Sequence, residues 1–114
     1  MTETRPIKRL RRWPRHRIDV RLKVLFSEGG TEKSAFGRGN NLSYGGMGAY
    51  IPCAIPVGAS VLLDVGFLYS PLGVTVKAVI RNCEGFRYGL EFQEISDHVR
   101  TVIAKNSEAA GVDE

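Results

Sequence analysis

Regular alternation of apolar and polar residues is the feature that most restricts how this chain can fold. From Ile18 to Phe26 every second residue is apolar, and similar alternation recurs over residues 74–81 and 86–93. A period of two is typical of a β-strand with one buried face and one exposed face. The pattern therefore predicts a protein built from β-strands.

Short segments rich in Gly, Pro, Asn and Ser separate these strands from three weaker candidates. We expect the weaker strands at about 35–40, 47–51 and 60–68, and we expect residues 27–34 to form a turn. The connection at 82–85 is short enough to join its flanking strands as a hairpin. Six strands joined by short turns predict an all-β fold, a six-stranded antiparallel β-barrel or sandwich.

The pattern changes to a helical period only near the carboxyl end. Ser96 is suited to cap a helix, and Val99, Val102 and Ile103 fall on one face of a short helix that we expect to end near Asn106. This helix is expected to cover an open end or edge of the barrel.

The length of 114 residues fits one domain. We expect a flexible basic N-terminal arm at 1–16, the barrel with its helix at 17–106, and a mobile acidic tail at 107–114. No apolar run approaches the roughly 20 residues of a membrane-spanning helix, and the amino end lacks the apolar block of a signal peptide. We therefore expect a cytoplasmic protein without membrane insertion.

Positive charge is concentrated near the amino end. The segment 5–23 holds nine Lys or Arg residues and one acid, Asp19, so it carries +8, whereas the whole chain carries +4 and the remainder −4. A basic arm on a mildly acidic body indicates an anionic partner, such as a nucleotide, a nucleic acid or a membrane surface.

Residues suited to catalysis or metal binding are sparse. We expect His16 and His98 to be solvated surface side chains, and Asp64 is the one carboxylate inside an apolar run, which gives no acid–base pair. Cys53 and Cys83 form no CxxC pair and have no histidine at metal-ligand spacing, so we interpret both as buried thiols. The sequence predicts no enzyme, no metal site and no cofactor.

The turn NNLSYGG, residues 40–46, has two interpretations. Asn41 and Ser43 side chains often hydrogen-bond only to nearby backbone, while the glycines supply positive φ or close packing. The same amide and hydroxyl, aimed outward, would bind the polar edge of a ligand. Ser43 lacks the G-x-S-x-G context of a nucleophile.

Arg11 and Arg15 stand four residues apart just before the first strand. The flat guanidinium group matches phosphate oxygens and the O6 and N7 edge of guanine, so two such groups on a short arm can clamp one nucleotide. Two further pairs have this spacing, but residues 5 and 9 stand too far upstream, and residues 17 and 21 belong to the strand.

The combination resembles the PilZ domains, bacterial receptors for cyclic di-GMP. That family carries R-x-x-x-R before the first barrel strand and [D/N]-x-S-x-x-G at the end of the second strand. Arg11 and Arg15 match the first element, and Asn41, Ser43 and Gly46 match the second. The likeness extends to "YGLEFQEIS", which is similar to the closing strand and the start of the helix, so it covers nearly the whole chain.

The resemblance implies a PilZ-type barrel that binds cyclic di-GMP through these five residues and signals to an unidentified effector protein. Arg11 and Arg15 would bind phosphates and guanine edges, Asn41 and Ser43 would bind the second guanine side, and Gly46 would permit the turn. Next to them, residues 12 and 13, an arginine and a tryptophan, are expected to assist by charge and by stacking, although simple packing of the tryptophan stays open.

Two alternatives stay open. The first is a basic barrel that binds RNA or single-stranded DNA, which we disfavour because Phe86, Tyr88 and Phe92 alternate as core residues would and leave no stacking platform. The second is a PilZ-like interaction module that binds no nucleotide, which the intact motif residues disfavour.

Overall fold

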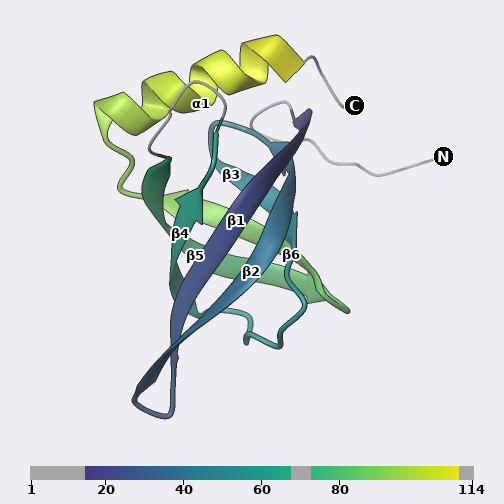
Figure 1. Cartoon of the computed structure of the whole chain (residues 1–114), viewed down its shortest axis with the longest axis vertical. Helices are drawn as coiled ribbons and strands as arrows, with labels where there is room; N and C mark the ends of the chain where they lie inside the picture. Colours follow the sequence, from purple (N-terminus) through teal and green to yellow (C-terminus); the bar gives the residue numbers. More distant parts are fainter. Residues whose placement is uncertain (1–14, 68–72, 111–114) are drawn as a thin grey trace, which may run out of the picture.

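The computed structural model describes residues 15–67 and 73–110. In these ranges six strands form a closed antiparallel barrel, and one helix lies across one end of it (Figure 1). The elements are β1 (His16–Glu28), β2 (Thr31–Leu42), β3 (Gly46–Tyr50), β4 (Ser60–Val65), β5 (Val74–Glu84), β6 (Arg87–Gln93) and α1 (Asp97–Ala110). The predicted six-stranded antiparallel barrel and carboxyl-terminal helix are confirmed.

The strands follow the order β1-β2-β3-β6-β5-β4, and pairing of β4 with β1 closes the barrel. Closure removes the free edges that an open sheet would expose. Inward residues of all six strands contribute to one core, although those of β2 are only half-buried along much of its length; among the fully buried residues are Leu22, Val24, Leu42, Leu63, Val65 and Ile80. The alternation in the sequence thus reflects which side chains face this core.

The first hairpin is longer than the sequence predicts. Residues 27–34 do not form an extended turn, because β1 continues to Glu28 and β2 begins at Thr31. Gly29 and Gly30 make the whole turn, with φ of 59° and 80°. Positive φ at both central residues is what a two-residue type I′ turn requires, so polar residues on both sides continue the ladder.

Phe86 is the first of three side chains whose exposure the sequence analysis misassigns. It lies in the turn between β5 and β6, is 45% exposed and packs edge-on against Tyr50, with ring centroids 6.3 Å apart. Phe36 on β2 is 72% exposed. Of the three aromatic residues predicted to face the core, Tyr88 and Phe92 are buried, and Phe86 is not.

Cys83 and His16 are the other two. Cys83 is exposed rather than buried, because the end of β5 extends beyond the packed part of the barrel. Cys53 is half-buried. His16 is 9% exposed rather than solvated, because it opens β1 opposite Leu42 instead of belonging to the arm.

Helix α1 begins as the sequence predicts and ends later. Ser96 Oγ accepts a hydrogen bond from the Val99 N–H at 3.2 Å, which caps the first turn. The apolar face packs against β1. The helix continues past Asn106 to Ala110, and its buried side includes Asn106 and Ser107.

Tyr88 on β6 fastens the loop between β3 and β4. Its buried hydroxyl accepts a hydrogen bond from the Ile55 N–H at 3.0 Å and donates one to the Cys53 carbonyl oxygen. Burial, the largest cause, raises the pKa of Tyr88 above 10.0. A neutral hydroxyl is therefore part of the folded state.

Tyr88→Phe is expected to lower the free energy of unfolding by about 1–3 kcal/mol, because the buried Ile55 N–H loses its acceptor. Because the folded pKa is raised, the contribution of Tyr88 is complete below about pH 10 and is lost as pH rises above that value. Urea unfolding at pH 7 and pH 10.5 measures both effects. Tyr50→Phe, at an exposed hydroxyl, is the matched control, and equal stability losses in the two variants would contradict this account.

Candidate functional site

Arg15 and the turn meet at one hollow of the barrel surface. Antiparallel pairing sets the start of β1 beside the end of β2, with Arg17 opposite Asn41. Arg15 Nη1 donates a hydrogen bond to Asn41 Oδ1 at 3.3 Å. Both side chains line a hollow of about 280 Å³ together with Ser43 and Gly46. Four of the five predicted site residues therefore lie together, and Arg11 lies outside the described residues.

Asn41 is held over the neighbouring strand. Its Oδ1 also accepts a hydrogen bond from the Gly48 N–H at 3.0 Å, and its Nδ2 donates to Asn40 Oδ1 at 3.3 Å. A Cβ atom at position 48 would lie 2.6 Å from Asn41 Nδ2. Gly48 is thus required for the Asn41 amide to lie flat against β3, which is the close-packing role that glycine serves here.

Ser43 closes the turn between β2 and β3. Its N–H donates to the Gly46 carbonyl at 2.9 Å, its hydroxyl donates to the same oxygen at 3.4 Å, and Oγ accepts from the Gly45 N–H at 3.3 Å. The local structural role proposed for this side chain is therefore present. A hydroxyl oxygen accepts two hydrogen bonds, so one acceptor position of Ser43 is left for a ligand.

Gly46 serves close packing rather than turn freedom. Its φ lies outside the left-handed region, so of the two glycine roles that the sequence suggested, positive φ or close packing, Gly46 has the second. A Cβ atom there would lie 2.1 Å from the Leu90 carbonyl oxygen on β6. Gly46 is needed because β3 and β6 pair at this point and leave no room for a side chain.

The hollow also contains residues that the sequence did not indicate. Asn82 comes from β5 and Gly89 from β6, and the Arg81 guanidinium makes an ion pair with Glu91 beside them. A second hollow of about 530 Å³ is also lined by Asn41 and Asn82, and it includes Arg87. Neither R-x-x-x-R nor N-x-S-x-x-G includes these positions, whose place follows from the pairing of β3, β6 and β5.

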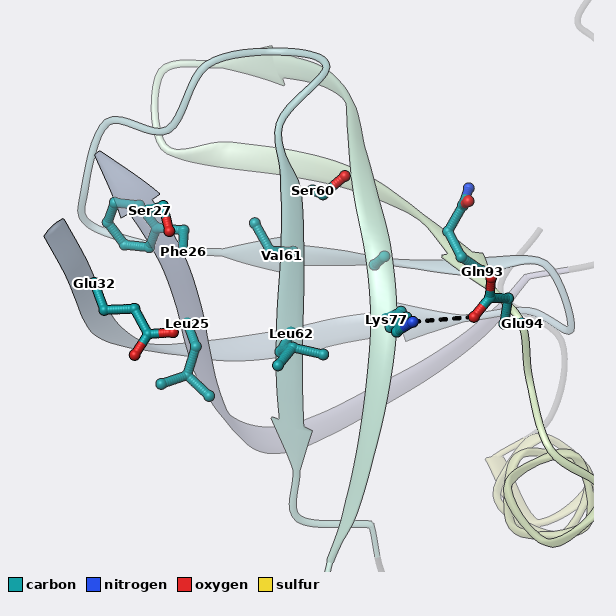
Figure 2. Close-up of a pocket in the computed structure, with 11 residues that line it drawn as sticks. Leu25, Phe26, Ser27, Glu32, Ser60, Val61, Leu62, Lys77, Gln93 and Glu94 are labelled. Atoms are coloured by element: carbon teal, nitrogen blue, oxygen red, sulfur yellow. Dashed lines mark hydrogen bonds and ion pairs between the residues drawn. The ribbon is translucent and has the colours of Figure 1, made fainter. Parts of the chain in front are cut away.

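A further hollow of about 450 Å³ contains none of the predicted site residues. Figure 2 shows it between β1, β4 and β5, lined by apolar side chains such as Leu25 and Leu62 and by an ion pair of Lys77 Nζ with Glu94 Oε1 at 3.1 Å. Size alone does not make it the site, because its one cation, Lys77, is already paired and its other charged group, Glu32, is an acid, so the hollow offers an anionic ligand no unpaired positive charge.

Metal-binding and membrane-spanning features can be stated for the described residues alone. There, no three His, Cys, Asp or Glu side chains are grouped so that they could hold a metal ion. Over the same ranges, no helix has the length and apolar character needed to cross a membrane.

A comparison with family models finds the PilZ domain over residues 9–107. Among solved structures, the PilZ domain with c-di-GMP of YcgR from Escherichia coli is similar at 16% identity and a TM-score of 0.67, covering 90% of this chain and 92% of that chain. The PilZ domain of CeSA from a cellulose-synthesizing bacterium is similar at 13% identity and a TM-score of 0.62, covering 83% and 95%. No curated protein matches the sequence significantly.

A third solved structure, the inhibitor of motility MotI/DgrA from Bacillus subtilis, has 16% identity and a TM-score of 0.63, covering 89% of this chain and 50% of that chain. Identities this low support the fold, and the barrel is accordingly of the PilZ type. The family model matches from the basic arm to helix α1 and includes both sequence elements that meet at the hollow. This chain therefore belongs to the PilZ domain family.

Proposed function

We propose that this PilZ domain is a cytoplasmic receptor for cyclic di-GMP that binds the dinucleotide and signals to an effector protein, with no catalytic activity of its own. The ligand-binding residues in this proposal are Arg11, Arg15, Asn41, Ser43 and Gly46. The observation that carries it is the hydrogen bond of Arg15 to Asn41, which joins the arginine element to the N-x-S-x-x-G element at one hollow.

Each group has a distinct task in this proposal. The guanidinium groups of Arg11 and Arg15 provide charge and paired donors for phosphate oxygens or a guanine edge. The Asn41 amide and the remaining acceptor of Ser43 bind the second guanine side. Gly46 keeps β3 close to β6 so that the ligand can approach the backbone.

Signalling in this proposal depends on the arm. Arg15 is the last arm residue before β1 and already contacts the barrel through Asn41. Binding of a ligand to Arg11 and Arg15 together would fix the preceding arm against the barrel surface. A partner protein that contacts the fixed arm would then distinguish the bound state from the free state.

Nucleic-acid binding is a second candidate because three aromatic rings are exposed within the described part of the barrel. Phe36, Tyr50 and Phe86 are all exposed, and Lys23 Nζ lies 5.8 Å from the Phe36 ring centroid. Exposed rings beside positive charge are the elements of single-strand binding. These three residues lie outside the hollow of Arg15 and Asn41, so the two candidates use different surfaces.

Arg15→Ala is expected to weaken cyclic di-GMP binding roughly tenfold to a hundredfold, because it removes a charge-assisted contact worth about 1–3 kcal/mol. Calorimetric titration measures the affinity. Arg38→Ala is the matched control, since Arg38 pairs with Asp19 at 2.7 Å and does not line the hollow. Equal affinities of parent and Arg15→Ala would contradict the proposed site.

The same titration separates the two candidate functions. The receptor predicts saturable binding of cyclic di-GMP and none of GMP or a short single-stranded RNA. Nucleic-acid binding predicts no heat with cyclic di-GMP, together with RNA binding that falls steeply between two salt concentrations. Loss of RNA binding in Phe36→Ala would then identify the aromatic surface.

Asn41→Asp is expected to retain cyclic di-GMP binding, whereas Asn41→Ala is expected to lose about tenfold in affinity. The carboxylate keeps acceptors for the Gly48 N–H and for Arg15, while alanine leaves both without their partner. Titration gives the affinities, and thermal melting shows whether each variant folds. A folded Asn41→Ala protein that binds as tightly as the parent would remove Asn41 from the site.

A further inference from the structure

Four residues form a straight row across the outer surface of the barrel. Asn41 on β2 pairs with Gly48 on β3, Gly48 pairs with Gly89 on β6, and Gly89 pairs with Asn82 on β5. The two central positions have no side chains. The only side chains that the row presents to solvent are therefore the two asparagine amides, one on β2 and one on β5.

Both amides lean inward over the glycines. A Cβ atom at position 48 would lie 2.6 Å from Asn41 Nδ2, and one at position 89 would lie 2.6 Å from Asn82 Oδ1. Strand β2 has a register shift between Gly39 and Asn41, and strand β5 has one between Ile80 and Asn82, in each case just before the asparagine. Such bulges commonly re-aim a side chain, and here they give the two asparagines equivalent placements.

The two asparagines differ in their internal partners. Asn41 Oδ1 accepts from Arg15 and from the Gly48 N–H, which accounts for its position. The Asn82 amide makes no hydrogen bond to any residue of the described ranges, and Asn82 is exposed. It nevertheless borders both hollows on this surface. An amide so placed, with no task inside the chain, is available to a ligand.

We propose that Asn82 is a further ligand-contacting residue of this site and that its Oδ1 accepts a hydrogen bond from a guanine base. The inference rests on the proposed binding of cyclic di-GMP. Guanine carries N–H donors at N1 and N2, and arginine side chains only donate, so base recognition needs an acceptor. Glu91 is occupied by Arg81, and Asn41 Oδ1 is already shared by two donors. The remaining acceptor of Ser43 serves the second guanine side in the proposed function, so the first guanine needs an acceptor of its own.

Asn82 and Arg15 stand at opposite ends of the row. Arg15 contacts Asn41 on β2. Asn82 lies three strands away on β5, so the backbones at Asn41 and Asn82 are roughly 14 Å apart along the sheet, at about 4.8 Å per strand. In this arrangement the phosphates stay near the arginines, and one base extends over Gly48 and Gly89 toward Asn82. Gly89 is then required because a side chain at this position would displace the Asn82 amide from its position over β6.

Titration of Asn82→Ala with cyclic di-GMP tests the inference, and we expect an affinity about tenfold weaker than that of the parent. Asn82→Asp keeps the acceptor and is expected to bind more tightly than Asn82→Ala. Gln93→Ala removes an amide from β6 at the hollow of Figure 2 and is expected to bind like the parent. All three should keep the melting temperature of the parent, since the Asn82 amide has no internal partner.

Gly89→Ala provides a second route, because the added methyl group displaces the Asn82 amide. We expect a similar loss of affinity, while Gly66→Ala, where the nearest atom would be 3.7 Å from the new Cβ, is the matched control. Unchanged affinity in Asn82→Ala overturns the inference, and so does weaker binding by Asn82→Asp than by Asn82→Ala, which would indicate donation to phosphate. If the parent protein itself binds no cyclic di-GMP, that result alone contradicts the proposed function. Failure of the proposed function is thereby distinguished from failure of the inference about Asn82.

Discussion

Antiparallel pairing of β1 with β2 is the constraint on which the candidate site depends. It brings the start of β1, where the basic arm ends, beside the end of β2, where the N-x-S-x-x-G element begins. Arg15 and Asn41 are 26 residues apart in sequence and still share a hydrogen bond. The site is therefore a product of strand pairing and does not require the two elements to be near each other along the chain.

Glycines give this surface its shape. At Gly46, Gly48 and Gly89 a side chain would collide with a strand or an amide, and none of the three has the left-handed backbone that glycine turns require. The absence of side chains lets two asparagine amides lie on the sheet with a hollow on either side. Glycine thus acts here by leaving space, and the space is bordered by hydrogen-bonding groups.

The sequence predicts β1, β5 and β6 well because each carries its own evidence, the alternation of buried and exposed residues. It misjudges Phe86 and residues 27–34 because a turn interrupts that alternation, and two glycines with positive φ need less chain than the polar segment suggested. Arg15, Asn41, Ser43 and Gly46 follow from local motifs. Asn82 does not, because its relation to Asn41 arises from three strand pairings and two bulges that no local pattern records.

Mapping the backbone amide resonances on addition of cyclic di-GMP tests most directly whether this surface is the binding site. The account predicts that the N–H signals of Gly46, Gly48 and Gly89 shift in a saturable way, while those of Gly29 and Gly66 stay in place. Absence of shifts, or shifts confined to the hollow around Leu62 and Lys77, would contradict it.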